Sequence, residues 1–287
     1  MIHTGFIPDA PNPLHWKMGS GTARKVFGRT ELMPGGHGWK DFLPKKEIQK
    51  RGKLETSACT IFGTANALET LANFYGYTDF PKDLAERYNA VLAKITPEGG
   101  SPHRSAETFR LFGGIPEHAL PFSEDIRSWE YFYAPDPMVE EFITLGQNLL
   151  RKYRIGHEFV WHSADEFTPG KAIAALGRGT VCVSVSAWQE RDGLYRKFGP
   201  DGHWLQLVDY KEGEYWLLYD SYEPTLKKYE WDAKFEQAKL FFMSPNPSKA
   251  LPHEIDYLKW LLANGKFLEV MKWLSKNIGS WLSGGRS

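Results

Sequence analysis

The sequence contains little cysteine. Among its 287 residues only Cys59 and Cys182 are cysteines, and they lie far apart. No CxxC pair and no cluster of cysteine and histidine with zinc-ligand spacing accompanies them, so neither a disulfide framework nor a zinc site is indicated. We therefore expect two free thiols in a reducing compartment, no metal and no organic cofactor.

The sequence also lacks an excess of either charge, a signal peptide and a long apolar run. Lysine plus arginine and aspartate plus glutamate number 35 each, so no net field would attract a polyanion. The N-terminus has no basic region followed by an apolar stretch, and no run approaches the ~20 apolar residues that span a bilayer. These absences predict a soluble, cytoplasmic protein without a nucleic-acid partner or a transmembrane segment.

Hydrophobic residues, in contrast, are plentiful. They make up 42% of the chain, and aromatic residues make up 15%, which is enough for a sizeable core. We expect an extended N-terminal arm over 1–45, rich in glycine and proline, and one globular domain over 46–245. Residues 246–287 are predicted to form a linker and an amphipathic helix that docks on the domain or on a partner, with a membrane surface as the alternative. Its apolar residues at helical spacing are Phe267, Met271, Leu274, Ile278 and Trp281.

The hydrophobic periodicity changes along the domain. Its first half has the i, i+3, i+4, i+7 spacing of helices, and its second half has short runs rich in β-branched and aromatic residues. We predict helices over 59–75, 104–112, 138–152 and 170–177. We predict strands over 180–187, 204–210, 215–220, 226–231 and 239–243. Helices followed by strands indicate an α+β protein with two lobes.

Cys59 opens the first predicted helix, directly after the small residues TSA. A thiol attacks as the thiolate, which is favoured at a helix N-terminus beside an imidazolium, whereas the alternative is a small buried core residue. His203 follows a glycine turn at the start of a predicted strand, and the next strand ends in Asp220. A hairpin turning at 211–214 would bring Asp220 beside His203, where it would orient the imidazole. Together these residues form a candidate site for a thiol nucleophile.

The order and separation of Cys59, His203 and Asp220 resemble those of the papain-like (C1-type) cysteine peptidase family. Three further blocks are similar to family segments, namely EGGSPHRSAETFRLFGGIPEHALPF, KAIAALGRGTVCVSVSAW and YWLLYDSYEP. The first is similar to the cleft-lining glycine pair and the helix after it, the second to the segment leading into the first barrel strand. The resemblance covers 46–245. It implies a papain-like two-lobed fold, with a central helix lobe and an antiparallel β barrel-like lobe.

The resemblance also implies a role for each matching residue. Cys59 would be the nucleophile, and its amide would form part of the oxyanion hole. His203 would act as general base and later as general acid, and Asp220 would orient the imidazole. Gly99 and Gly100 would offer main-chain hydrogen bonds to an extended peptide.

The chain departs from the family pattern around the nucleophile. The family places a glutamine six residues before the cysteine as an oxyanion donor, and this chain has Lys53 there. We therefore assign Lys53, together with Cys59, to the oxyanion hole. Gln49, ten residues before Cys59, reaches the oxyanion hole only if the loop is remodelled. Thr60 and Tyr222 replace two tryptophans of the family pattern. No typical long inhibitory segment is visible.

The predicted function is that of a cysteine-type peptidase that hydrolyses peptide or isopeptide bonds, including cell-wall cross-links if the source is a phage or bacterium. Acyl transfer to an amine by the same residues is a second possibility. An alternative of another class is a catalytically weak or inactive papain-like fold in an assembly such as a virion, with the N-terminal arm and the C-terminal helix as docking elements.

Three other residues are assigned to the structure rather than to chemistry. Cys182 lies in an alternating strand and is expected in the core. His157 and His162 are five residues apart with no further ligands nearby in the sequence, so we expect core or surface histidines rather than a metal pair.

Overall fold

The computed structural model describes residues 5–20, 38–186, 189–246, 262 and 271. Apart from Leu262 and Met271, the predicted C-terminal helix lies outside these residues. None of the helices in the described part of the chain is both long and apolar enough to cross a membrane.

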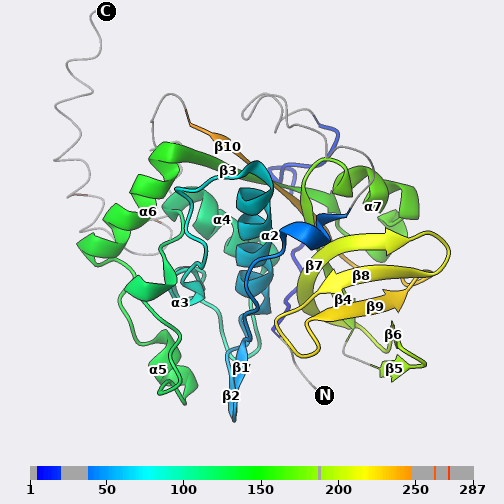
Figure 1. Cartoon of the computed structure of the whole chain (residues 1–287), viewed down its shortest axis with the longest axis horizontal. Helices are drawn as coiled ribbons and strands as arrows, with labels where there is room; N and C mark the ends of the chain where they lie inside the picture. The colour runs from blue at the N-terminus through cyan, green and yellow to red at the C-terminus, as the bar shows by residue number, and fades with distance from the viewer. Residues whose placement is uncertain (1–4, 21–37, 187–188, 247–261, 263–270, 272–287) are drawn as a thin grey trace, which may run out of the picture.

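Helix α2, Cys59–Tyr75, stands in the middle of the molecule, with helices on one side and the large sheet on the other (Figure 1). Every residue from Cys59 to Ala72 is buried. A helix that is buried all round must be packed on several faces, which is why its apolar and small residues extend beyond one stripe. The helix ends at Gly76, whose left-handed conformation lets its N–H bond the carbonyls of the last turn. The prediction of a helix over 59–75 is confirmed.

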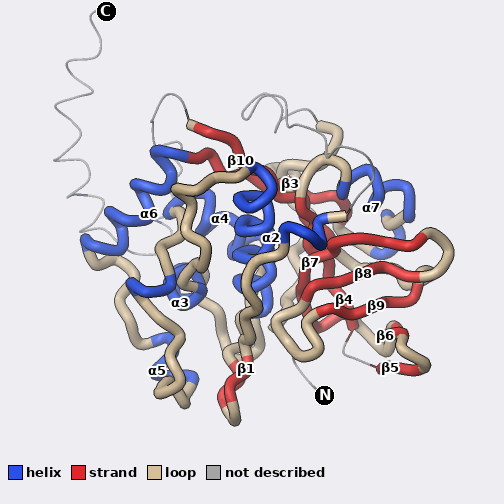
Figure 2. Tube along the Cα trace, in the orientation of Figure 1, coloured by secondary structure: helices blue, strands red, loops and turns tan. Residues whose placement is uncertain are grey.

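The first lobe consists of α2 and the helices that lie between it and β3 in the sequence (Figure 2). Helix α4 (Pro102–Phe112) has a favourable N-terminus, because Ser101 accepts a hydrogen bond from the Arg104 amide and Pro102 occupies the first turn. The other helices of the lobe are α3 (Glu86–Leu92), the short 3-10 helix η3 (Glu117–Ala119), α5 (Trp129–Tyr133) and α6 (Glu140–Lys152).

The second lobe is an eight-stranded sheet in the order β3-β10-β4-β7-β8-β9-β6-β5. Its pairings are antiparallel except for β6 with β9. The strands are β3 (Tyr153–Trp161), β4 (Thr180–Ser186), β5 (Gln189–Arg191), β6 (Leu194–Arg196), β7 (Asp201–Lys211), β8 (Tyr215–Tyr219), β9 (Leu226–Glu230) and β10 (Ala238–Pro245). Two further helical elements accompany the sheet, η4 (Ala164–Glu166) and α7 (Pro169–Leu176). Helices first and strands later confirm the α+β prediction.

Strand β3 and helix α3 were not predicted. Of the nine residues of β3 only Arg154 is not buried, so the strand carries no alternation of apolar and polar residues to reveal it. Helix α3 is also buried on most sides, and its sequence contains Glu86, Arg87 and Asn89 among the buried residues. Burial on all sides removes the periodicity from which both elements would have been inferred.

Polar contacts join the sheet to α2. The Thr180 hydroxyl donates to the carbonyl of Ala67 over 3.0 Å, and the Cys182 thiol donates to the carbonyl of Gly63 over 3.2 Å. Both cysteines are free and buried, and Cys182 lies in the core as predicted. These contacts hold β4 against α2. Strand β7 pairs with β4 and lies near the first turn of α2, where the candidate site is.

Candidate active site

Cys59 is the first residue of α2 and is fully buried. Burial raises the pKa of its thiol well above the usual range, and the charges of Asp220 and Glu55 raise it further. Hydrogen bonds from the main-chain amides of Trp204 and Thr60 act in the opposite direction but do not outweigh burial. In this arrangement Cys59 is therefore a protonated thiol rather than a thiolate.

His203 and Asp220 lie together in the interior beside this cysteine. The distance between Nε2 of His203 and Oδ1 of Asp220 is 2.7 Å, and both side chains are fully buried. The pair forms because β7 and β8 are antiparallel neighbours, in which Gln206 pairs with Tyr219, so that the residue after β8 lies near the start of β7.

Lys227 is a third member of this buried group. Its Nζ lies 2.8 Å from Oδ2 of Asp220, and it also donates to the carbonyls of Tyr222 and Pro224. Burial alone would raise the pKa of Asp220, but the neighbouring His203 and Lys227 outweigh burial and hold that pKa below its ordinary value. Asp220 is thus ionised, and it is oriented on both of its oxygens.

The main-chain amide of Trp204 connects the two halves of the site. Trp204 follows His203 in β7, and its amide bonds the Cys59 sulfur. Its indole is packed against the first turns of α2, since a Cβ on Gly63 would lie only 3.0 Å from it. The structure thus brings Cys59, His203 and Asp220, which are distant in the sequence, to the junction of the two lobes.

The chain before Cys59 forms a hairpin that the sequence patterns did not reveal. Strands β1 (Lys50–Arg51) and β2 (Leu54–Glu55) pair in antiparallel register, with Gly52 at positive φ in the turn between them. Lys53 lies in this turn and is exposed, beside a surface hollow that Leu54, Pro97 and Trp129 also line.

Gln49, in contrast, is completely buried, and it lies beside the two residues that follow Asp220. Its Oε1 accepts from the Ser221 hydroxyl at 2.7 Å, and its Nε2 donates to Oε1 of Glu55 at 2.8 Å and to the Tyr222 hydroxyl at 2.9 Å. The hairpin takes up the additional residues between Gln49 and Cys59. Ser221 and Tyr222 directly follow Asp220, so Gln49 lies at the site although it is ten residues from Cys59 in the sequence.

Glu55 places a carboxyl group in the same network. It accepts from the Ser57 amide at 3.0 Å, and the Tyr222 hydroxyl donates to its other oxygen. Burial, followed by the charge of Glu55, raises the pKa of Tyr222, so this hydroxyl keeps its proton and remains a donor. The carboxyl of Glu55 is one of the groups that raise the pKa of Cys59.

Residues 5–9 of the N-terminal arm lie between the two lobes at this site. The Ile7 amide donates to the carbonyl of Gly100 over 3.0 Å, and the Gly100 amide donates to the carbonyl of Gly5 over 2.8 Å. On the opposite side, the Phe6 amide donates to the carbonyl of Gly202, the residue before His203, over 3.1 Å. Gly100, predicted to bind an extended peptide, therefore bonds an extended segment of its own chain.

Side chains anchor the arm as well. The Phe6 ring stacks on the indole of Trp204 with centroids 5.7 Å apart. Asp9 accepts from the Ser101 hydroxyl and, over 2.8 Å, from the His103 amide at the start of α4, while its own amide and carbonyl bond the side chain of Gln237. No typical long inhibitory segment is visible in the sequence, yet residues 5–9 lie across the junction in which Cys59 is buried. The sequence did not predict this position of residues 5–9, because the arm has no periodicity and its docking depends on main-chain bonds.

A scan against protein-family models found no match, and a search of curated proteins found none either. Among solved structures, the chain is similar to digestive procathepsin L2 proteinase from the larval midgut of Tenebrio molitor, with a TM-score of 0.54, 16% identity, and coverage of 85% of this chain and 77% of that one. It is also similar to xylellain, a cysteine protease from Xylella fastidiosa, with a TM-score of 0.55, 15% identity, and coverage of 84% of this chain and 94% of that one.

At identities this low, structural similarity shows the fold alone, and the chemistry has to be argued from the residues of the site. Both similarities extend over most of each chain. The chain therefore has the α+β, papain-like two-lobed fold that its sequence blocks implied.

Proposed function

We propose that this chain is a cysteine-type peptidase that cleaves peptide or isopeptide bonds, with Cys59 as nucleophile, His203 as general base and Asp220 as the group that orients the imidazole. The observation that carries this proposal is the buried His203 and Asp220 pair, 2.7 Å apart, next to a cysteine that opens a buried helix. The papain-like fold supports the same assignment, since the similar structures are a procathepsin L2 proteinase and xylellain, a cysteine protease.

The proposed reaction follows from the hydrogen bond that His203 makes. With Nε2–H donating to Asp220, the tautomer leaves Nδ1 able to accept the proton of the Cys59 thiol. The thiolate then attacks the scissile carbonyl carbon, and the imidazolium returns the proton to the leaving amine. Water, deprotonated by the same nitrogen, attacks the thioester and releases the acid and the free thiol.

For the oxyanion we assign the Cys59 main-chain amide and the side chain of Gln49 in place of Lys53. Gln49 is buried and held at both ends of its amide, whereas Lys53 is exposed in the hairpin turn. A fixed amide is a better preorganised donor than a mobile ammonium group. In the arrangement observed, the Gln49 amide donates to Glu55 and Tyr222, so binding an oxyanion would require one of these bonds to be exchanged.

The arm indicates how a peptide substrate would lie. Residues 5–7 are extended between the carbonyls of Gly100 and Gly202, and a substrate backbone would use the same two positions. Substrate and arm cannot be bound at once. We therefore infer that the described arrangement is a latent form, consistent with the raised pKa of the buried Cys59 thiol.

The test is covalent labelling by an irreversible, thiol-directed peptidase inhibitor between pH 5 and 8, with the labelled residue identified by mass spectrometry. It is made in the Gly5→Ala variant, since a Cβ on Gly5 would overlap the main chain of Ser57 and displace the arm. We expect Cys59 to be labelled well below the pH at which an ordinary thiol of pKa ~8.5 reacts. Adding His203→Ala should remove this reactivity.

Cys182 is the internal control, because it is a second buried thiol in the same fold. If Cys59 in the Gly5→Ala variant reacts no faster than an ordinary thiol, or if His203→Ala changes nothing, the catalytic assignment is wrong. The role of an inactive fold in an assembly such as a virion would then gain support, which the similar structures reported above do not provide.

A further inference from the structure

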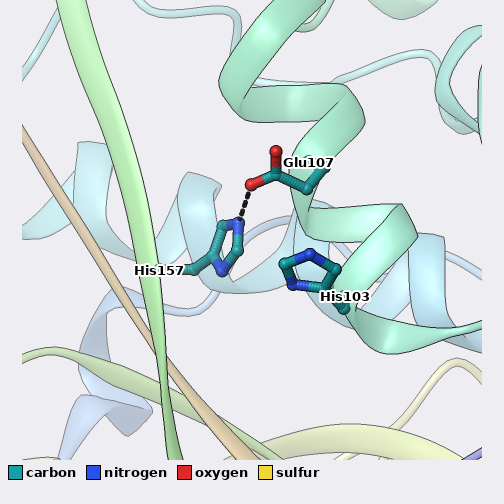
Figure 3. Close-up of side chains that lie close together, drawn as sticks. All are labelled: His103, Glu107 and His157. Atoms are coloured by element: carbon teal, nitrogen blue, oxygen red, sulfur yellow. Dashed lines mark hydrogen bonds and ion pairs between the residues drawn. The ribbon is translucent and has the colours of Figure 1, made fainter. Parts of the chain in front are cut away.

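Three potential metal ligands lie together away from Cys59. His103 and Glu107 are four residues apart on α4, so they project from the same face of the helix. His157 reaches them from β3, and Figure 3 shows the three side chains converging. One ligand atom from each residue lies within 4.8 Å of the others. The sequence did not reveal this group, because 50 residues separate Glu107 from His157.

The two imidazoles are in the form that binds metals. Burial, and next the positive charge of Lys239, lower the pKa of His103 to about 2 and that of His157 to about 4, so both are neutral at physiological pH. Nε2 of His157 lies 2.7 Å from Oε1 of Glu107. Nδ1 of His103 is buried and has no hydrogen-bond partner among the residues that the structure describes.

We propose that His103, Glu107 and His157 bind a divalent transition-metal ion of the zinc type. Two histidines and one glutamate form a common ligand set for zinc, in which a fourth position is left for water or a further group. This inference departs from the expectation that the chain binds no metal, which rested on sequence spacing alone.

The geometry requires only side-chain adjustment. Tetrahedral ligands around zinc lie about 3.3 Å apart, which falls between the 2.7 Å contact of His157 with Glu107 and the 4.8 Å limit of the group. His103 and Glu107 are only partly buried, so an ion has a route to the site. Arg110 donates to both oxygens of Glu107 at 2.8 and 2.7 Å and would hold this carboxylate in place outside the coordination sphere.

Lys239 and Arg110 both carry positive charge that opposes an ion, and Lys239 is the one that makes no bond to a proposed ligand in the structure. It is completely buried, and its ammonium lies 3.5 Å above the ring of Phe159, the residue two positions after His157 in β3. Burial lowers the pKa of Lys239 to about 7, and the charge of its protonated form disfavours protonation of both histidines. Removing it should therefore strengthen metal binding, whereas a merely adventitious surface site would not respond.

The site also lies beside the anchor of the N-terminal arm. The His103 amide donates to Asp9, and the imidazole of His15 packs against that of His103 with ring centroids 4.2 Å apart. A metal ion would thus stiffen the start of α4 where the arm is attached.

The experiment is titration of the full chain with Zn²⁺ by calorimetry, and with Co²⁺ followed by its visible absorption. All proteins carry Cys59→Ala, so that a thiol beside His203 cannot bind the ion. We expect one site with a Kd of about 10 μM or tighter. We also expect a Tm increase of about 5 °C at an ion concentration a hundred times the Kd.

Matched variants locate the site. His103→Gln and His157→Gln should each weaken binding at least about tenfold and abolish the tetrahedral Co²⁺ bands, while Lys239→Met should strengthen it about three- to tenfold. His118→Gln, which changes an exposed histidine of the same lobe, should have no effect. Circular dichroism verifies that each variant is folded. Absence of a site with a Kd of about 10 μM or tighter, or equal affinity in His103→Gln and His118→Gln, would overturn the proposal.

Discussion

Gln49 and Lys53 illustrate what can be concluded at the scale of single residues. Sequence spacing favoured Lys53 as the side-chain oxyanion donor, because it lies six residues before Cys59 as the family pattern requires. In the structure the hairpin of β1 and β2 occupies the residues between Gln49 and Thr56, and Gln49 is the buried residue next to Ser221. Counting residues along the chain assumed that no hairpin intervenes, and this hairpin is too short to leave a periodic signal.

The two candidate donors are distinguished by alanine substitution. In the arm-displaced Gly5→Ala background, Gln49→Ala should lower kcat/KM for a peptide substrate by about 10² to 10³, because one preorganised donor is lost. Lys53→Ala should leave kcat/KM within about twofold, since its side chain is in solvent. The measurement is the initial rate with a fluorogenic peptide, together with the urea midpoint of each variant. A larger loss for Lys53→Ala would restore the original assignment.

At the scale of elements, the position of the N-terminal arm differs most from what its sequence indicates. Its glycines and prolines predicted extended coil, and residues 5–9 are extended, but the sequence contained no information on where they lie. The main-chain bonds to Gly100 and Gly202 involve no specific side chain on either partner. Such contacts have no sequence signature, whereas α2, with its apolar spacing and the residues TSA before it, was predicted to its observed bounds.

Two glycines of the arm provide a matched test of its position. Gly5 and Gly19 both have positive φ, but only at Gly5 would a Cβ collide with another part of the chain, the carbonyl of Ser57. Gly5→Ala should therefore displace the arm and increase the labelling rate of Cys59 at least about tenfold over wild type, because the segment that buries the thiol is released.

Gly19→Ala imposes similar backbone strain without that collision and should label like wild type. The rates are compared at one pH with the same thiol reagent, and limited proteolysis reports whether the arm has become accessible. Equal labelling of the two variants would mean that the arm does not control access to Cys59.

At the scale of the whole molecule, buried carboxyl groups make stability depend on pH. Burial raises the pKa of Glu117 to about 7, and it raises the pKa values of Glu69 and Glu86 well above their ordinary range. A carboxyl group whose folded pKa exceeds its unfolded value contributes stability that is fully present below the unfolded pKa and is lost as pH rises through the folded pKa. For Glu117 this window extends from about 4.5 to about 7.

The Tm of the wild-type chain should accordingly fall between pH 5 and pH 8. Glu117→Gln should reduce that decrease, because the amide keeps the hydrogen bond from the Phe122 amide and does not titrate. Glu124→Gln, at an exposed carboxyl, serves as the control and should not alter the slope. Calorimetric Tm values at half-unit steps of pH provide the measurement, and identical slopes for the two variants would contradict the role of Glu117.

The sequence alone determined the α+β class, the helix that begins at Cys59, and the order of Cys59, His203 and Asp220, because periodicity and turns are local properties of the chain. Only the tertiary structure decided that Gln49 lies beside Ser221, that residues 5–9 cross the junction of the two lobes, and that His103 and Glu107 meet His157. Each of these contacts joins segments far apart in sequence. Their partners are selected by packing and by main-chain hydrogen bonds, which no local pattern of residues records.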